Sequence, residues 1–300
     1  MINPATIALS PIVNLRPYVD ECDLVSINVG PNRQIYALLS DSKKYRVLEW
    51  TDGKLTLDIW IENEPFDLHD VQPLPDGELL LVCGRSSYRG KEDFDRNGRI
   101  YSREGHFVRE ILLGDGIQNV QTTSKGLIWT SFFDEGVFGN LGWHNPVGGS
   151  GLVAWDAQGE SQFEFQPTGE LDIICDCYAM NVDPDGCAWA YYYTQFCLVK
   201  IRDLKIESNW EIPVTGSSSF AVGGGLALFS GGYDDRDRYH LYRLGAKDEI
   251  SEIAQFSLVD HEGEALNQVR SFGRGDTLFL FDDTRIFGLN VATAADKTVA

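Results

Sequence analysis

The chain has 300 residues and a formal net charge of −20 at pH 7, and 43% of its residues are hydrophobic. That apolar content is ample for a buried core, which excludes a disordered chain. The charge predicts no binding to nucleic acid, because the phosphate backbone would be repelled along the whole approach. The same field would attract a basic protein and raise its rate of association. The alternative is that the acidic surface only keeps the protein soluble.

The amino-terminal sequence MINPATIALSPIVNLRP lacks the basic start of a signal peptide, and Pro4 and Pro11 interrupt its apolar stretch. No run of about 18 apolar residues occurs in the sequence, so we expect no membrane span and a cytoplasmic location. In that compartment the six cysteines are expected to be reduced and buried in strands. A zinc site is the alternative, but its candidate ligands lack paired C-x2-C spacing. Those candidates are Cys175, Cys177, Cys187 and Cys197.

Short strands separated by turns recur along the chain, whereas helical periodicity is almost absent. Each copy has a strand, a PDG-like turn and a second strand rich in Leu, Ile, Trp and Tyr. The six copies are VSINVGPNRQIYALL (25–39), HDVQPLPDGELLLV (69–82), QNVQTTSKGLIWTSF (118–132), AMNVDPDGCAWAYYY (179–193), SSFAVGGGLALFSG (218–231) and NQVRSFGRGDTLFLF (267–281).

A further pair of strands follows the copies, as in RVLEWTDGKLTLDIW (46–60) and RIYSREGHFVREILL (99–113). Six successive copies with four antiparallel strands each predict an all-β, six-bladed β-propeller. The strand signal of the sixth copy ends near residue 290, so the amino-terminal TIALSPIV (6–13) is expected to supply its outer strand and close the ring. The prediction is therefore a single propeller domain over residues 1–300.

This succession of inner strand, PDG turn, outward strand, variable loop and strand pair resembles NHL-repeat propellers. It is also similar to the gluconolactonase and senescence-marker group of six-bladed propellers. The resemblance extends over nearly the whole chain, but it is one of architecture, and no catalytic signature of a family comes with it. Resemblance to the lactonase group implies a metal held by carboxylates and amides at one mouth of the channel.

The first strand of each copy carries mostly polar side chains seven and five residues before its turn residue. These two positions share one strand face and are expected to line the channel mouth. A buried polar ring of this kind needs water or a ligand to satisfy it. We call these positions the polar column: Ser26/Asn28, Asp70/Gln72, Asn119/Gln121, Ala179/Asn181, Ser218/Phe220 and Gln268/Arg270.

An enzyme of this fold would be a metal-dependent, lactonase-like hydrolase that uses Asp70, Asn119 and Asn181. Asp70 is the one carboxylate in the polar column, and Arg270 would oppose a divalent cation there. The sequence contains no G-x-S-x-G, P-loop or H-E-x-x-H motif. It therefore favours a role other than catalysis and predicts no cofactor.

Three long connections, 85–98, 133–151 and 231–239, are expected on the face that carries the channel mouth. Each offers aromatic side chains and two carry acidic clusters, a composition typical of protein-binding surfaces. The alternative is that the aromatics fold down and cap the blades. The predicted partner-binding residues are Tyr88, Glu92, Asp93, Phe94, Asp95, Asp134, Glu135, Phe138, Trp143, Tyr233, Asp234, Asp235 and Asp237.

Residues 93–104, DFDRNGRIYSRE, match the EF-hand calcium-loop pattern in full. An EF-hand needs Glu104 to curl back to the metal, but RIYSRE is expected to be a strand. At about 3.3 Å per residue an extended strand would carry Glu104 roughly 20 Å from Gly98. We therefore expect no EF-hand. A smaller calcium site at Asp93, Asp95 and Asn97 is the remaining alternative, although three oxygens leave most of the roughly six to eight calcium ligands unfilled.

These features predict a cytoplasmic, acidic propeller that binds a basic protein through its long loops. Its most specific form is a bacterial immunity protein that inhibits a basic, nuclease-type toxin, since a nuclease needs cationic residues to hold phosphates. The alternatives are the lactonase-like hydrolase and a propeller scaffold that has no basic partner.

Overall fold

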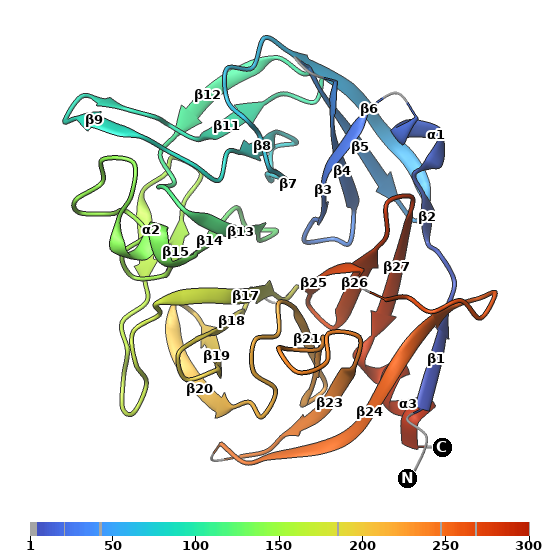
Figure 1. Ribbon diagram of the computed structural model, residues 1–300. Helices are drawn as coiled ribbons and strands as arrows, with labels where there is room; N and C mark the ends of the chain where they lie inside the picture. The colour runs from blue at the N-terminus through green and yellow to red at the C-terminus, as the bar shows by residue number, and fades with distance from the viewer. Residues whose placement is uncertain are drawn as a thin grey trace. The chain divides into compact units, whose positions relative to one another are not determined.

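The computed structural model describes residues 5–20, 22–41, 44–184, 186–246, 248–267 and 269–299. The predicted fold class is confirmed: six four-stranded antiparallel blades form an all-β propeller (Figure 1). The chain divides into two compact units, which we describe separately. The first unit is Tyr18–Cys177, and the rest of the described chain makes up the second unit. A single domain over residues 1–300 stays a prediction.

The first unit contains three blades. Their strands are β3 (Asp23–Val29), β4 (Ile35–Asp41), β5 (Lys44–Thr51) and β6 (Lys54–Glu62); β7 (Asp70–Pro73), β8 (Leu79–Val82), β11 (Gly98–Tyr101) and β12 (Phe107–Ile111); and β13 (Ile117–Thr122), β14 (Ile128–Phe132), β15 (Leu152–Trp155) and β16 (Ser161–Glu164). A two-stranded hairpin, β9 (Tyr88–Gly90) and β10 (Asp93–Phe94), and a short helix, α2 (Asp134–Phe138), lie in the connections. Another short helix, α1 (Arg16–Val19), includes the last residues before this unit begins at Tyr18.

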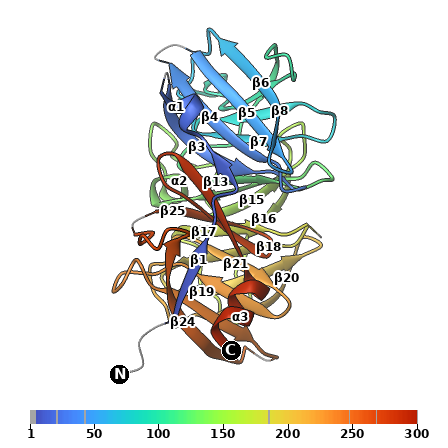
Figure 2. The same ribbon diagram turned by 90° about the vertical axis from the view of Figure 1, so that its right-hand side faces the viewer.

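The second unit contains the other three blades. Their strands are β17 (Asp176–Val182), β18 (Ala188–Tyr193), β19 (Cys197–Arg202) and β20 (Lys205–Glu211); β21 (Phe220–Gly223), β22 (Leu226–Phe229), β23 (Tyr239–Leu244) and β24 (Ile250–Asp260); and β25 (Arg270–Arg274), β26 (Thr277–Phe281) and β27 (Arg285–Asn290). A helix that the strand repeat did not predict, α3 (Val291–Val299), lies near the carboxyl end of the chain (Figure 2). It packs against β24 and β27.

The amino-terminal segment completes the sixth blade, as predicted, but with different residues. β2 (Val13–Asn14) pairs antiparallel with β27 as the outer strand of that blade. β1 (Ala5–Leu9) instead pairs parallel with β24 and adds a fifth strand to the fifth blade. Pro11 lies between the two strands, and proline cannot donate a ladder hydrogen bond. The segment predicted as one strand is therefore two short strands that join neighbouring sheets.

The turns and the middle strands of the repeat follow from local chemistry. Gly77 and Gly126 end their turns with φ of 80° and 89°, a left-handed conformation that glycine adopts without steric cost. The strands that follow, β8 and β14, are buried at every residue, because sheets pack on both of their faces. Each fully buried Leu or Phe there contributes about 1.5–3 kcal/mol. Five of the six cysteines are likewise buried, and Cys175 is half-buried.

The EF-hand pattern belongs to a strand, as expected. β11 pairs with β8 on one side and β12 on the other, so the backbone after Gly98 is extended rather than curled. Glu104 lies in the turn to β12 that Gly105 closes with φ of 83°. In the part of the chain that the structure describes, no helix is long and apolar enough to cross a membrane.

Candidate functional site

The polar column of the first unit links neighbouring blades. The first strand of the second blade, β7, contacts both β3 and β13 (Figure 1). From β7, the Gln72 amide accepts a hydrogen bond from the Thr122 backbone N–H at 3.1 Å and donates one to the Val29 carbonyl at 3.4 Å. Asn28 of β3 accepts from the Val71 N–H at 3.0 Å and donates to Asp70 at 2.8 Å. These amides therefore join three blades through their backbones.

In the second unit, Asn181 of β17 has the equivalent role. Its Nδ2 donates to the carbonyls of Phe220 and Gly275 at 3.0 Å each, and its Oδ1 accepts the Gly275 N–H at 2.7 Å. The strands come so close that a Cβ on Gly273 would lie 1.6 Å from the Phe220 carbonyl oxygen. Glycine at position 273 is thus required by the approach of β21 and β25.

The polar column was expected to need water or a ligand to satisfy its hydrogen bonds. At Asn28, Gln72 and Asn181 the backbone of neighbouring blades satisfies them instead. A first strand has one edge without a strand partner, so its backbone groups need hydrogen bonds from elsewhere. A primary amide supplies both donors and an acceptor. The more exposed members contribute less: Ser26 bonds to Asn28, Asn119 is half-buried, Ser218 is exposed and Arg270 lies over Phe281. Gln268 lies outside the described residues.

The three residues proposed for catalysis have different surroundings. Asp70 is half-buried and bonded to Asn28, and every amide hydrogen of Asn181 is committed to backbone carbonyls. Asn119 lies in the first unit with Asp70, whereas Asn181 belongs to the second unit. Among the described residues, no three His, Cys, Asp or Glu side chains lie close enough together to hold a metal ion. The geometry therefore favours a structural role for Asn181.

Replacing Asp70 with asparagine is expected to stabilise the protein at neutral pH. Burial raises the pKa of Asp70 above its ordinary value of 3.8, so ionisation opposes folding as the pH rises from that value through the raised pKa. The neutral asparagine can still accept the Asn28 hydrogen bond and removes this loss. Urea unfolding from pH 3.5 to 7.5 would show a stability gain that grows with pH. A variant less stable than the parent at pH 7 would contradict the prediction.

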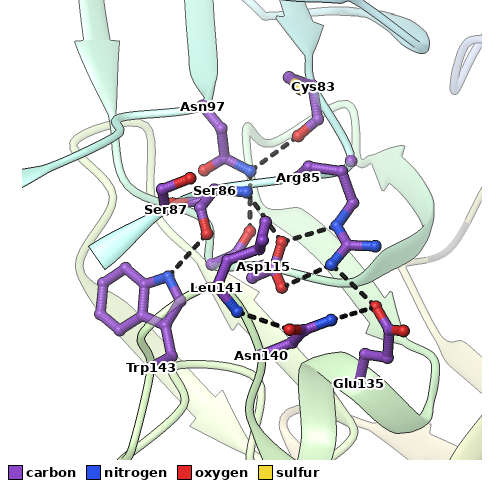
Figure 3. Close-up of polar contacts among 12 residues, drawn as sticks. Cys83, Arg85, Ser86, Ser87, Asn97, Asp115, Glu135, Asn140, Leu141 and Trp143 are labelled. Carbon is purple, nitrogen blue, oxygen red and sulfur yellow. Dashed lines mark hydrogen bonds and ion pairs between the residues drawn. The ribbon is translucent and has the colours of Figure 1, made fainter. Parts of the chain in front are cut away.

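An ion pair at the base of the first unit's long loops connects them (Figure 3). Arg85 donates through Nε and Nη2 to both carboxylate oxygens of Asp115, at 2.9 and 3.1 Å. Asp115 is only 3% exposed and also accepts the Ser86 backbone N–H at 2.9 Å. The same Nη2 lies 2.8 Å from Glu135 of α2. Arg85 thus joins the start of loop 85–98 to the helix in loop 133–151.

The contact continues through α2 to the tip of the second loop (Figure 3). Asn140 donates to Glu135 at 2.6 Å and accepts the Leu141 backbone N–H at 2.8 Å. The Asn140 hydrogen bond, and then the Arg85 cation, lower the pKa of Glu135. Tyr88 of the first loop donates its N–H to the Leu141 carbonyl at 2.9 Å. We call loops 85–98 and 133–151, joined in this way, the braced loop pair.

Three of the four aromatics predicted in these loops pack on one another. Trp143 is buried and donates its indole N–H to the Ser86 carbonyl at 2.8 Å. The half-buried rings of Tyr88 and Phe94 lie 4.8 and 6.0 Å from the Trp143 ring, measured between centroids. These three aromatics therefore fold down onto the protein, as the alternative to a binding role expected, and are not free for a partner. Phe138, by contrast, is 63% exposed at the end of α2.

The acidic residues of the first loop are partly neutralised within it. The Arg89 guanidinium donates to Asp93 at 2.8 Å and to Asp95 at 2.7 Å. Asn97 is fully buried, and its amide bonds to the backbones of Cys83, Gly114 and Leu113. The alternative calcium site would use Asp93, Asp95 and Asn97. The Arg89 guanidinium lies between the two aspartates, and the Asn97 amide is already bonded to the backbone. The side chains of Glu92 and Asp134 are exposed.

Sequence reasoning missed one exposed apolar side chain of this surface. Leu141 is 41% exposed beside Asn140, and its backbone has a left-handed φ of 43°. An apolar residue inside the glycine-rich stretch GNLGW was the available signal. Phe138 and Leu141 are thus two exposed apolar side chains of loop 133–151, and exposed carboxylates lie on both loops of the braced loop pair.

The third long connection, 231–239, lies in the second unit. Tyr233 is 56% exposed, and Asp234 and Asp235 are exposed beside it. Asp235 pairs with Arg238 at 3.4 Å. Asp237 is half-buried in the same loop. Tyr239 is buried, with its ring stacked 5.9 Å from that of Phe256. The placement of all three connections on one face stays a prediction, since the first two belong to the other unit.

The fold and these loops define a six-bladed β-propeller compatible with a protein-binding scaffold. A profile of the YxzG family matches residues 152–288, which is 137 of the 300 residues. No curated protein matches the chain.

Solved structures similar to the chain are themselves distant in sequence. The Hsv2 of Kluyvelomyces marxianus is 8% identical, with a TM-score of 0.53 over 90% of this chain and 77% of its own. The virginiamycin B lyase from Staphylococcus aureus is 13% identical, with a TM-score of 0.45 over 94% and 96%. A putative gluconolactonase is 13% identical, with a TM-score of 0.48 over 94% and 91%. Likeness at these identities shows the fold alone.

Proposed function

We propose that this chain is a protein-binding propeller whose partner is a basic protein, and that the partner docks on the braced loop pair. The observation that carries the proposal is Phe138, a largely exposed aromatic on a helix that Arg85 and Glu135 tie to the neighbouring loop. An apolar anchor that is already fixed in place costs little ordering entropy when a partner binds. Aromatic side chains, Phe among them, are enriched in protein interfaces, where a few anchor residues contribute most of the binding energy.

Charge supports a basic partner. The chain carries a net charge of −20, Asp134 is exposed on the same loop as Phe138, and Glu92 is exposed on the other loop of the braced loop pair. Such carboxylates steer a cationic protein toward the surface and raise its association rate. In its most specific form, we propose an immunity protein that blocks a nuclease-type bacterial toxin, because a nuclease presents the cationic groove that holds phosphates.

The experiment titrates the full chain with the basic protein encoded beside its gene, by calorimetry at 50 and 300 mM salt. We expect binding that weakens with salt, and an affinity at least tenfold lower for Phe138→Ser, since losing an aromatic anchor costs about 1.4 kcal/mol or more. Val108→Ser is the matched control, because Val108 is an exposed apolar residue of β12 outside the braced loop pair.

Two results decide between the general proposal and its specific form. If the partner is a nuclease, one equivalent of the chain should stop its cleavage of RNA or DNA; binding without inhibition would remove the immunity role. If no basic protein is encoded there, or none binds, or both variants weaken binding equally, the docking proposal fails.

A further inference from the structure

The second unit contains a groove of its own. It has a volume of about 1190 Å³, and it is lined by residues 213–215, residues 232–235 and the neighbouring strands β23 and β24, with Ala5 and Thr298. Three aromatic side chains line it: Tyr233, His240 and Tyr242. This volume exceeds the range of about 300–1,000 Å³ that is usual for a small-molecule pocket, so it has room for a peptide segment.

Tyr233 is exposed and yet held on several sides. Its N–H donates to the Thr215 carbonyl at 3.0 Å, and its hydroxyl lies 2.5 Å from that of Tyr178. A Cβ on Gly216 would lie 2.5 Å from the Tyr233 ring, so the ring rests directly on the backbone. The Phe196 ring meets it edge-on, with centroids 6.1 Å apart. An aromatic fixed in this way presents its surface to a partner without further ordering.

The charges along the groove are mainly negative. The Oε1 atom of Glu252 accepts a hydrogen bond from the Gln255 amide at 2.9 Å and lies 3.1 Å from His240 Nδ1, which can donate to it. Asp234 and Asp235 stand on the opposite loop, and Arg238 neutralises Asp235 through their ion pair. Asp234 and Glu252 thus remain as carboxylates beside an aromatic wall.

We propose that this groove binds an arginine side chain of an extended basic peptide, with its guanidinium over the Tyr233 ring and hydrogen-bonded to the carboxylates of Glu252 and Asp234. A guanidinium is planar, stacks on aromatic rings and offers five donors in a fork that matches carboxylates. Lysine offers a compact, strongly hydrated charge that uses the ring less well. The inference rests on the proposed function, because it names the side chain that a basic partner would present.

The arginine site can be tested by fluorescence anisotropy, with labelled GGRGGRGG and GGKGGKGG peptides titrated with the full chain. We expect the arginine peptide to bind more tightly than the lysine peptide. Tyr233→Leu and Glu252→Gln should each weaken the arginine peptide at least fivefold. Tyr233→Phe keeps the ring and should retain binding, which separates loss of stacking from loss of the Tyr178 contact. Asp203→Asn is the charge control, because Asp203 is exposed in a turn outside the groove.

Equal affinity for the two peptides, or an equal effect of Asp203→Asn and Glu252→Gln, would mean that the overall negative charge explains the binding. Either result would overturn the inference. Absence of binding would overturn it as well. The titration of Phe138→Ser with the neighbouring basic protein is independent of this result. Binding of that protein alongside failure of the peptide would leave the proposed function standing without the arginine site.

Discussion

Replacing Asn181 with alanine is expected to lower the free energy of unfolding by about 2–5 kcal/mol, because two buried backbone groups lose their partner and each unmade bond costs about 1–3 kcal/mol. Those groups are the Phe220 carbonyl and the Gly275 N–H, whereas the Gly275 carbonyl keeps its hydrogen bond from the Val222 N–H. Urea denaturation followed by tryptophan fluorescence would show a lower midpoint at an unchanged slope.

Ser219→Ala is the matched control for Asn181. Ser219 is also buried between β21 and β25, but its hydroxyl has one side-chain partner, Ser271, at 2.6 Å. Its loss is expected to cost about 1 kcal/mol. If the two variants were equally stable, the amide would not be what holds the first strands of these blades together.

Replacing Arg85 with methionine is expected to destabilise the first unit by about 2–3 kcal/mol. The substitution leaves the Asp115 carboxylate buried with only the Ser86 N–H as a partner, and an uncompensated buried charge is costly. The value is below that of a fully buried pair, because Arg85 itself is partly exposed and solvated. Thermal unfolding of the variant would show a lower Tm.

Two further variants test the cause of that loss. Adding Asp115→Asn to Arg85→Met removes the stranded charge, so the double variant should be more stable than the sum of the single effects predicts. Arg89→Met, in the same loop, breaks ion pairs with the exposed Asp93 and the partly exposed Asp95, which keeps its hydrogen bond from the Ser87 N–H, and should change the Tm much less. Additive effects, or an equal loss from Arg89→Met, would show that Arg85 does not act through Asp115.

The blades could be predicted from the sequence because the residues that specify their turns and strands are close together in the chain. A PDG-like turn needs a left-handed glycine, as at Gly77, and the strand after it needs apolar residues on both faces, as in LLLV of β8. The same reasoning assigned the EF-hand pattern to a strand, since Ile100 continues a strand period. Pro11 was visible as well, but which sheet would accept the residues on either side of it depended on pairings with β24 and β27.

The sequence by itself determined the fold class, the repeat and the acidic charge, because turn chemistry, strand alternation and composition act within a few residues or over the whole surface. Tertiary structure alone decided what the polar and aromatic side chains do. Asn181 bonds to residues 39 and 94 positions away, and Trp143 bonds to Ser86 across 57. Whether a side chain caps a neighbour or remains exposed like Phe138 and Tyr233 depends on such distant partners, which no local pattern specifies.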